Sequence, residues 1–314
     1  MKTIPFWKMS GSGNDFVVID NRRRVIRGGY GAWARRLCHR QFGVGADGLL
    51  LLEPDKRQDF RMVYYNADGS RADMCGNGAR CMAYFAHARG AVPGKFRFRT
   101  DAYPVGAKVD GQIVQISLAD ARNYKPEVPA KVDGKIYRPA FLNTGVPHAV
   151  LIVSNADQVY VSGLGRALRF HRVFGRKGAN INFVQKIGPN RLRVRTYERG
   201  VEAETLACGT GVTASAIAAA LQGLVKAPVQ CVVTGGDTLE VNFKMHRENR
   251  GRPATQITLK GPVRLTFKGE FHLRHGRQTV SRLPATSRRL SWRASGDRLP
   301  MAIAPIARKE GKGV

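Results

Sequence analysis

Two cysteines in this chain begin the same short pattern, in which cysteine is followed by glycine, a variable residue and a second glycine. Cys75 stands in MCGNGARC and Cys208 in ACGTG, and a helix-favouring stretch follows each of them. A cysteine directly before a helix faces unpaired N–H groups and the positive end of the helix dipole, which lower the pKa of its thiol. The glycines let backbone N–H groups approach a bound anion closely. The pattern therefore predicts two reactive thiols, each in an anion-binding turn.

Two thiols that face each other across a cleft can do a defined kind of chemistry. One removes a proton from one face of a carbon while the other supplies a proton to the opposite face, which inverts a stereocentre through a carbanion. Because the α-proton of an amino acid is weakly acidic, preorganised donors must stabilise the charge that develops on its carboxylate. Two helix N-termini aimed at that carboxylate would provide such donors without a metal or a pyridoxal cofactor.

The sequence around the two cysteines is an internal repeat. A shift of 133 residues brings Cys75 onto Cys208 and produces seven identities among 30 aligned residues, where average residue usage would give roughly two. We therefore expect a duplicated domain. The identical pairs are Tyr64 and Tyr197, Cys75 and Cys208, Gly76 and Gly209, Gly78 and Gly211, Ala83 and Ala216, Ala86 and Ala219, and Gly90 and Gly223.

Each copy of the repeat predicts several strands and one enclosed helix. The first helix places Ala79, Met82, Ala83 and Ala86 on one face and stops at Gly90, and the second, GVTASAIAAALQG, is small and apolar on nearly all sides. We expect an α+β fold of two pseudo-symmetric domains, each a curved, barrel-like mixed β-sheet around a central helix. The active site is expected in the cleft between the domains.

The expected domain boundaries follow from the repeat and from composition. We assign residues 1–123 to the first copy and 124–261 to the second, with strand 262–271 free to return and pack on the first copy. Residues 272–314 are rich in Arg, Ser and Pro and lack periodicity, which predicts a basic and mostly disordered tail.

The cysteine count favours reduced thiols. The five cysteines, Cys38, Cys75, Cys81, Cys208 and Cys231, are odd in number and scattered, so they are poor material for a disulfide framework. The chain has no CxxC pair and no matching His or Cys cluster, so we expect no metal site. Outside the repeated pattern, the other three cysteines are expected to be structural.

The charge and hydropathy of the chain limit the kinds of partner that it can be expected to bind. The chain has 52 Lys and Arg against 23 Asp and Glu, a net charge of +29, but these charges are spread along the chain without an aromatic-interleaved basic motif. We therefore favour a solvated basic surface that attracts an anionic metabolite over nucleic-acid binding. The sequence has no apolar run of 18 residues and no signal-peptide pattern at its start, so we expect no membrane partner and a cytoplasmic location.

From about residue 3 to residue 270 the chain resembles the diaminopimelate epimerases, which interconvert LL- and meso-diaminopimelate without a cofactor. The resemblance is carried by MSGSGNDFVVID, FGVGADGLL, YYNADGS, MCGNGAR, NTGVPHAV, GANINFV and YERGVEAETLACGTGV. It implies the two-domain fold, a small-molecule substrate and Cys75 and Cys208 as the acid/base pair. It leaves the oligomeric state open, with a homodimer as one possibility.

The resemblance also implies roles for matching residues. Backbone N–H groups at four positions would hold the reacting carboxylate: Gly76, Asn77, Gly209 and Thr210. Glu198 would receive the reacting ammonium, and His148 would assist proton movement. The far end of the substrate would be held by Asn14, Asn66, Asn180 and Arg199.

The chain differs from the family pattern at two positions, and two alternative functions are compatible with the sequence. Val146 replaces an Asn that many members of the family have before Pro-His, and Gly48 replaces a Gln that some have, so contacts to the far end are less defined than the cysteines. Proline and hydroxyproline racemases share the paired-cysteine logic, but they typically carry His at the position of Asn77 and lack the Glu198-Arg199 pair. A basic nucleic-acid-binding protein on the same fold is the rival of a different class.

Overall fold

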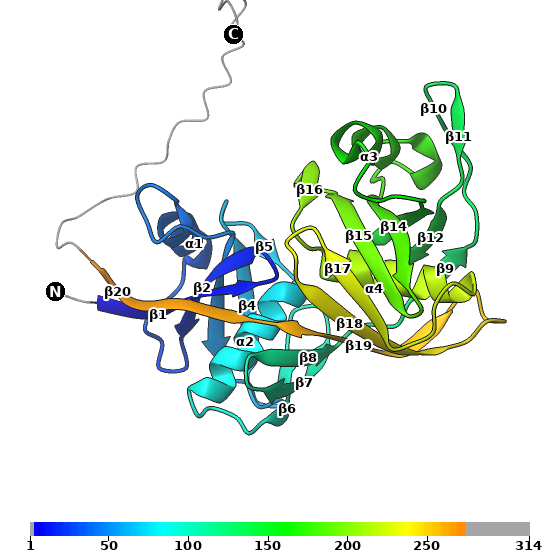
Figure 1. The fold of residues 1–314 in the computed structure, drawn as a ribbon. Helices are drawn as coiled ribbons and strands as arrows, with labels where there is room; N and C mark the ends of the chain where they lie inside the picture. Colours follow the sequence, from blue (N-terminus) through cyan, green and yellow to red (C-terminus); the bar gives the residue numbers. More distant parts are fainter. Residues whose placement is uncertain (1–2, 274–314) are drawn as a thin grey trace, which may run out of the picture. The chain divides into compact units, whose positions relative to one another are not determined.

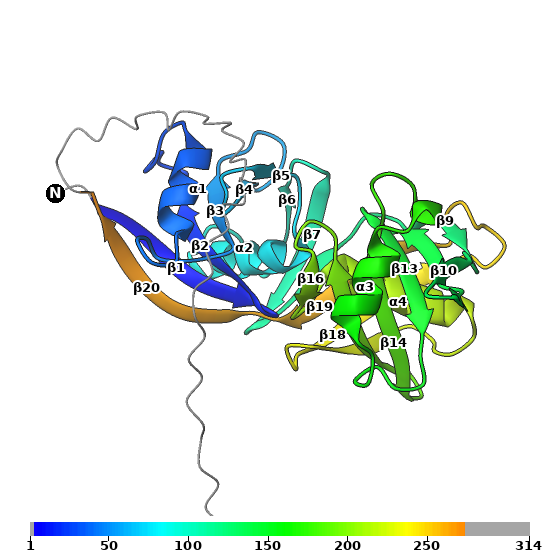
Figure 2. The ribbon, with the colours of Figure 1, turned by 90° about the horizontal axis from the view of Figure 1, so that it is seen from above.

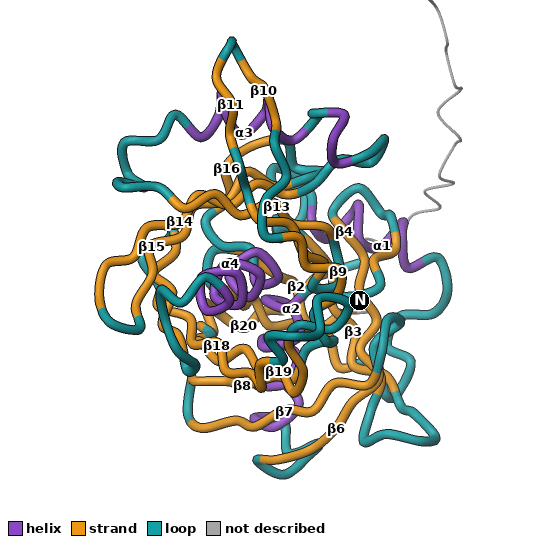
Figure 3. The backbone as a smooth tube through the Cα atoms, turned by 90° about the vertical axis from the view of Figure 1, so that its right-hand side faces the viewer, coloured by secondary structure: helices purple, strands orange, loops and turns teal. Residues whose placement is uncertain are grey.

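Two central helices organise the computed structural model, which describes residues 3–273. Helix α2 (Gly76–Ala88) and helix α4 (Gly209–Leu221) each begin directly after a cysteine of the repeated pattern, and the shift of 133 residues maps one helix onto the other. Strands surround both helices (Figure 3). The two enclosed helices predicted from the sequence are confirmed.

The burial of the helices explains their composition. In α2 the predicted face of Ala79, Met82, Ala83 and Ala86 is fully buried, and α4 is buried on nearly every side. Gly90 adopts a left-handed conformation, φ 66°, just after α2 ends, as a helix-terminating glycine does. Small residues let the sheet approach α4 closely from all directions.

The first copy supplies most of one lobe of the sheet (Figure 1). Its elements are β1 (Thr3–Gly11), β2 (Asn14–Asp20), α1 (Tyr30–Cys38), β3 (Gly48–Glu53), β4 (Arg61–Asn66), β5 (Arg71–Ala72), α2, β6 (Lys95–Arg99), β7 (Pro104–Asp110), β8 (Ile113–Ser117) and β9 (Arg122–Lys125).

The second copy repeats this order and adds a small hairpin. Its elements are β10 (Ala130–Val132), β11 (Lys135–Tyr137), β12 (Ala140–Asn143), β13 (Pro147–Ile152), α3 (Val161–Arg169), the 3-10 helix η1 (Arg172–Phe174), β14 (Asn180–Gly188), β15 (Arg191–Glu198), β16 (Ala203–Thr205), α4, β17 (Val229–Val233), β18 (Thr238–Met245) and β19 (Ala254–Pro262). The last strand of the described chain is β20 (Arg264–His272).

The pairing of the strands is duplicated as well. Strand β2 pairs in parallel with β3, and β13 pairs in parallel with β14. The parallel pairs β4 with β6 and β15 with β17 correspond in the same way. The pseudo-symmetric α+β fold with mixed sheets is therefore confirmed.

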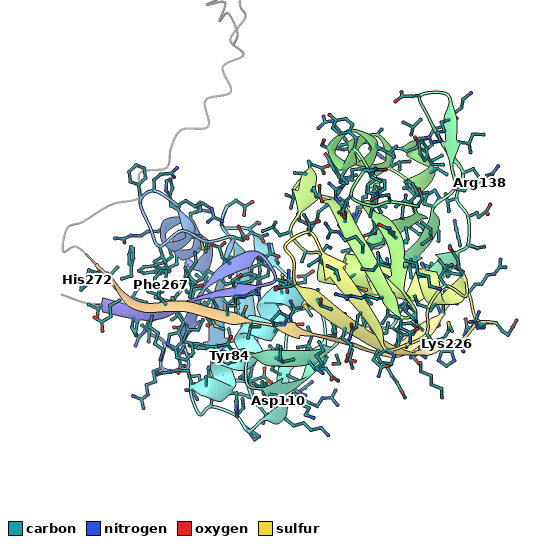
Figure 4. All side chains as sticks on the ribbon, in the orientation of Figure 1. Tyr84, Asp110, Arg138, Lys226, Phe267 and His272 are labelled. Carbon is teal, nitrogen blue, oxygen red and sulfur yellow. The ribbon has the colours of Figure 1, made fainter. Side chains whose placement is uncertain are left out.

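The two copies exchange strands along their boundary. Strand β19 pairs with β18 of its own copy and with β8 of the first, and β9 pairs with β12. Strand β20 then returns along β1 (Figures 1 and 2), where Phe267 packs edge-on against Phe6 with ring centroids 6.0 Å apart (Figure 4). The return of this segment to the first copy therefore occurs, while the domain boundaries at 123 and 261 stay predictions.

Outer helices cover the face of each sheet that turns away from the central helix. In β2, Phe16 and Val18 pack in the core that contains α2, whereas Val17 and Ile19 pack with α1. Helix α3 covers the second copy in the same way. Strands that are buried on both faces carry continuous apolar runs, which accounts for the Leu49–Leu52 segment.

The predicted basic tail lies outside the described residues except for His272 and Leu273, and His272 ends β20. Within residues 3–273, no helix is long and apolar enough to cross a membrane.

Candidate active site

Both patterned cysteines line one cavity of about 660 Å³ between the two copies. Nine of the twelve residues predicted for the site contribute to its wall: Asn14, Asn66, Cys75, Gly76, Asn77, Glu198, Cys208, Gly209 and Thr210. The fold thus brings residues that are far apart in sequence to one place. The roles assigned to them stay predictions at this point.

The N-termini of α2 and α4 meet at this cavity. A Cβ atom placed on Gly209 would lie only 3.9 Å from Gly76 Cα, and 3.0 Å from Cδ2 of Leu259. The same Leu259 methyl group is the nearest atom to a Cβ placed on Gly76, at 3.7 Å. Leu259 is fully buried on β19 and therefore forms a wedge between the two helix starts. A side chain at position 209 would crowd this Leu259 methyl group, which would have to shift by a few tenths of an ångström.

Each cysteine occupies the N-cap position of its helix in an extended conformation. Cys75 Sγ accepts a hydrogen bond from the backbone N–H of Gly78 (3.5 Å). Cys208 Sγ lies 3.5 Å from Thr210 Oγ1. All five cysteines are free thiols. Cys75 is partly buried as a residue, but its sulfur atom is enclosed by protein atoms. The two sulfur atoms are therefore placed at the positive ends of two helix dipoles.

The expected lowering of the thiol pKa values is wrong. Burial raises the pKa of Cys75, against the opposing effect of the Gly78 N–H group, and burial raises the pKa of Cys208. The negative charge of Glu198 raises both further. Desolvation penalises a thiolate more than one helix terminus stabilises it, and the sequence pattern carried no information about how deeply the sulfur atoms are enclosed.

Asn77 connects the copies across the cleft. Its Nδ2 donates to Asn14 Oδ1 (2.7 Å) in the first copy and to the carbonyl oxygen of Ala207 (3.3 Å) in the second. Within the second copy, Thr144 Oγ1 donates to the carbonyl oxygen of Thr210 (2.9 Å). These bonds join the β1–β2 turn, α2 and the turn before α4 into one polar frame.

Other polar groups in the wall are held by local hydrogen bonds. Tyr64 donates through its hydroxyl to Asn66 Oδ1 (2.7 Å), and Asn14 Nδ2 donates to Asp47 Oδ2 (3.1 Å). Glu198 ends β15, and burial raises the pKa of its carboxyl group. The cavity wall therefore combines amide and hydroxyl groups with carboxyl groups, of which that of Glu198 is made easier to protonate by burial.

Three predicted residues do not line the cavity. Asn180 is buried, donates to the carbonyl oxygen of Pro147 (3.2 Å) and accepts from the backbone N–H of Arg199 (2.7 Å). Asn180 therefore holds the backbone at Arg199, which is another of the three residues outside the cavity wall. His148 is fully buried with Nδ1 3.2 Å from Asn182 Nδ2, and burial lowers its pKa to about 3, so the ring is neutral.

The structure also places residues in the wall that the sequence did not single out. Tyr64 was matched only as one member of the repeat, and Thr144 stands inside the quoted NTGVPHAV motif without having been assigned a role. The neighbouring Val146 lines the cavity, so the departure from Asn noted there puts an apolar side chain in the wall. The further lining residues are Ala72, Asp73, Met74, Ala102, Tyr103, Ala119, Asp120, Arg122, Asn143, Gly145 and Ala207.

The second departure has a packing explanation. A Cβ atom on Gly48 would lie 2.5 Å from the ring of Tyr64 and 2.8 Å from the carbonyl oxygen of Tyr65. Glycine is therefore needed where the Tyr64 ring crosses β3. Within residues 3–273, no group of three or more His, Cys, Asp or Glu side chains is arranged to hold a metal ion.

The chain matches a known family over both copies of the repeat. The sequence model of the family described as "Diaminopimelate epimerase" matches residues 6–118 and 140–265. The chain belongs to the diaminopimelate epimerase family. The resemblance stated from the sequence is therefore confirmed.

Relatives in this epimerase family match over most of their length. The diaminopimelate epimerase of Aquifex aeolicus is 45% identical over 279 residues, covering 85% of this chain and 97% of the relative. That of Flavobacterium psychrophilum is 39% identical over 263 residues, covering 83% of this chain and 98% of the relative.

Solved structures of other families share the architecture of these epimerases. A Bacillus anthracis phenazine biosynthesis protein of the PhzF family has a TM-score of 0.66 at 14% identity, covering 87% of this chain and 100% of its own. A probable proline racemase from Agrobacterium radiobacter also has a TM-score of 0.66, at 15% identity, covering 88% of this chain and 94% of its own. At this identity the likeness concerns the fold alone.

Proposed function

We propose that the chain is a cofactor-independent epimerase that interconverts LL-2,6-diaminopimelate and meso-diaminopimelate. The observation that carries the proposal is the pair of cysteines, Cys75 and Cys208, which cap two helices whose N-termini meet at one cavity. Membership of the diaminopimelate epimerase family supports this substrate over proline or hydroxyproline. The reaction belongs to the supply of lysine and of peptidoglycan precursors.

In the proposed reaction the two sulfur atoms act on opposite faces of one α-carbon. The thiolate of one cysteine takes the α-proton and becomes a thiol, which leaves the electron pair on the carbon and its carboxylate. The thiol of the other cysteine then delivers its proton to the opposite face and becomes a thiolate. Protons and charge balance, and the two thiols have exchanged protonation states. No external oxidant or reductant is needed.

The helix starts supply the stabilisation that the carbanion requires. We assign the reacting carboxylate to the backbone N–H groups of Gly76, Asn77, Gly209 and Thr210, which lie at the first turns of α2 and α4. Each preorganised donor of this type is worth about 3 to 4 kcal/mol of transition-state stabilisation. Because the donors come from both copies, a shift between the copies would weaken them together.

The remaining polar residues are assigned to the rest of the substrate. Glu198 receives the reacting ammonium, and its burial strengthens that charge pairing. We assign the far amino-acid end to Asn14, Asn66, Asn180 and Arg199, and His148 to assisting proton movement in its neutral form. Val146 offers the far end an apolar contact in place of an amide.

The proposal extends to the setting of the reaction. We also propose a cytoplasmic location and a homodimer, both on the basis of the family. All the residues that line the cavity come from one chain, so the site itself does not need a second copy. The excess of Lys and Arg suits the attraction of a substrate with two carboxylates. Nucleic-acid binding remains the less favoured alternative, and no structural feature described above favours it.

Incubation of LL-diaminopimelate with the protein in deuterated water tests the function. A two-base reaction should place one deuterium at the inverted α-carbon of the meso product, while LL substrate recovered early in the reaction stays largely unlabelled. Product stereochemistry and isotope content are read by chiral chromatography with mass spectrometry. Absence of both meso product and label would refute the epimerase proposal.

Cysteine variants test the two-base step separately. Cys75→Ser and Cys208→Ser should each lower kcat for epimerisation by at least about 100-fold, because a serine hydroxyl is a much weaker acid and base partner than a thiol. Cys38→Ala, which removes a buried thiol of α1, is the matched control and should retain activity. Full epimerisation by either serine variant would exclude the paired-thiol mechanism.

A further inference from the structure

Arg80 is a buried cation on α2, the helix that begins directly after Cys75. It lies on α2, five residues after Cys75, and its side chain is fully buried. Its Nη2 group donates to Ser12 Oγ (2.9 Å) and to Asn77 Oδ1 (2.9 Å). Among residues 3–273, its Nε and Nη1 atoms have no hydrogen-bond partner. Buried charges are normally paired with an opposite charge, but the hydrogen-bond partners of Arg80 are both uncharged.

The hydrogen bonds of Arg80 lead to the polar frame of the cleft. Asn77, which Arg80 orients, is the residue that reaches both Asn14 and the carbonyl oxygen of Ala207. With Asn77 Oδ1 accepting from Arg80, its Nδ2 group must point at those two acceptors. The guanidinium thus fixes which way the Asn77 amide faces, and with it the link between the two copies.

The nearest carboxylate on this path is already paired. Ser12, which adopts a left-handed conformation with φ 54°, hydrogen-bonds Asp237, and Asp237 Oδ2 accepts from Arg264 Nη1 (2.9 Å). Asp237 is therefore paired directly with Arg264, and it acts on Arg80 only through space. Burial lowers the pKa of Arg80, yet a guanidinium keeps its proton in proteins at neutral pH.

The duplication shows that this cation is present on one side only. The shift of 133 residues places Thr213 where Arg80 stands, and Thr213 Oγ1 donates to the carbonyl oxygen of Gly209 (2.8 Å) within its own helix. Cys208 has the Thr210 hydroxyl beside it and no buried cation in the equivalent place. The two thiols are equivalent in backbone position but unequal in electrostatic surroundings.

The groups that act on Cys75 come from several elements. Glu198 at the end of β15 disfavours its thiolate, while Arg80 of α2 favours it. Tyr64 of β4, Cys81 of α2 and Cys208 of the second copy are the other acidic groups coupled to it by charge. The N–H groups of Gly78 and Asn77 oppose burial and Glu198 at this thiol together with Arg80, which is the cation among these groups.

We propose that Arg80 is a positioning residue that orients Asn77 across the cleft and, through its buried positive charge, makes Cys75 the more readily deprotonated of the two thiols. The inference rests on the proposed two-thiol reaction. Of the two protonation forms that the reaction interconverts, it favours the form with the thiolate on Cys75 and the proton on Cys208.

Alkylation of the free protein measures the thiolate at each site without substrate. Iodoacetamide reacts with thiolates, so its rate at Cys75 and Cys208, quantified by peptide mass spectrometry across pH, follows deprotonation of each thiol. Arg80→Gln keeps an amide donor for Ser12 and Asn77 but removes the charge, whereas Arg80→Lys keeps a charge. Arg169→Met changes the other buried arginine, on α3, and is the matched control.

The expected result separates charge from structure. In wild type, Cys75 should react faster than Cys208 below pH 8. Arg80→Gln should slow alkylation of Cys75 about tenfold, which corresponds to a one-unit shift of its titration midpoint, while Cys208 changes little. Arg80→Lys should restore most of the Cys75 rate, and Arg169→Met should leave the titration of Cys75 unchanged. If Arg80→Gln does not fold, Arg80→Met takes its place.

Two outcomes overturn the inference. An unchanged Cys75 titration in Arg80→Gln, or equal shifts at Cys75 and Cys208, would mean that Arg80 does not select the thiolate. The α-proton exchange assay with diaminopimelate distinguishes this from failure of the proposed function. A protein that shows the predicted thiol asymmetry but no exchange would refute the substrate while leaving the role of Arg80 intact.

Discussion

The wedge formed by Leu259 between the two helix starts leads to the sharpest prediction. Leu259 is fully buried on β19, with one methyl group beside both Gly76 and Gly209. The change Leu259→Ala removes that methyl group and lets the N-termini of α2 and α4 approach or tilt. We expect it to damage the geometry in which four backbone N–H groups converge on one carboxylate.

The size of the effect follows from packing and from geometry. Truncation of a buried leucine to alanine costs about 2 to 5 kcal/mol of the free energy of unfolding. A displacement of about 1 Å at a reacting centre costs on the order of 100-fold in rate. Leu259→Ala should therefore lower kcat for epimerisation about 100-fold in protein that is still folded at the assay temperature.

Ile257→Ala is the matched control. Ile257 lies two residues earlier on the same buried face of β19 and belongs to the same core, but the atom nearest to both helix-start glycines is that of Leu259. Its truncation should cost a similar free energy of unfolding in urea titrations. We expect Ile257→Ala to keep kcat within about threefold of wild type, since the oriented donors stay in place. If the two variants lose stability and kcat equally, Leu259 is a core residue without a special role.

Two further predictions concern the buried surroundings of the site. Gly78 and Gly211 are equivalent in the two helices, but a Cβ would lie 3.3 Å from Phe16 Cζ at the first and 2.4 Å from Asn182 Oδ1 at the second. Gly78→Ala should therefore leave the Tm nearly unchanged, while Gly211→Ala should cost about 2 kcal/mol of unfolding free energy by leaving buried polar groups unpaired; equal Tm values would contradict this. Burial lowers the pKa of His148 from 6.5 to about 3, so its contribution to stability is complete above pH 6.5 and is lost as the pH falls toward 3. Between pH 7 and pH 5, wild type should lose about 2 kcal/mol more than His148→Gln in urea unfolding, and equal losses would show that the ring is not held neutral.

The sequence predicted local features well where they depend on neighbours along the chain. The starts of α2 and α4, the glycine that ends α2 and the buried face of α2 all follow from spacing, because helix periodicity and capping are local. Because the sequence is duplicated, the helix-start position predicted for Cys75 could also be predicted for Cys208. Two cysteines separated by 133 residues could be paired in one site without any structure.

Features that depend on distant contacts were missed or misjudged. Leu259 and Thr144 carry no motif of their own. The place of Leu259 depends on how β19 pairs across to the first copy, and that of Thr144 on how the loop after β12 meets the start of α4. The sequence likewise contained Arg80 inside the quoted MCGNGARC stretch, but nothing local indicated that its charge would be buried without a direct carboxylate partner.

By itself, the sequence determined the repeated architecture, the catalytic candidates Cys75 and Cys208 and the family, because these depend on residue types and their spacing. Only the tertiary structure decided how acidic the two thiols are. A helix start lowers the pKa of a thiol and burial raises it, and the balance depends on how much water the surrounding strands exclude. It also decided that the two helix starts differ in their surroundings, since α2 carries a fully buried guanidinium at Arg80 where α4 carries Thr213.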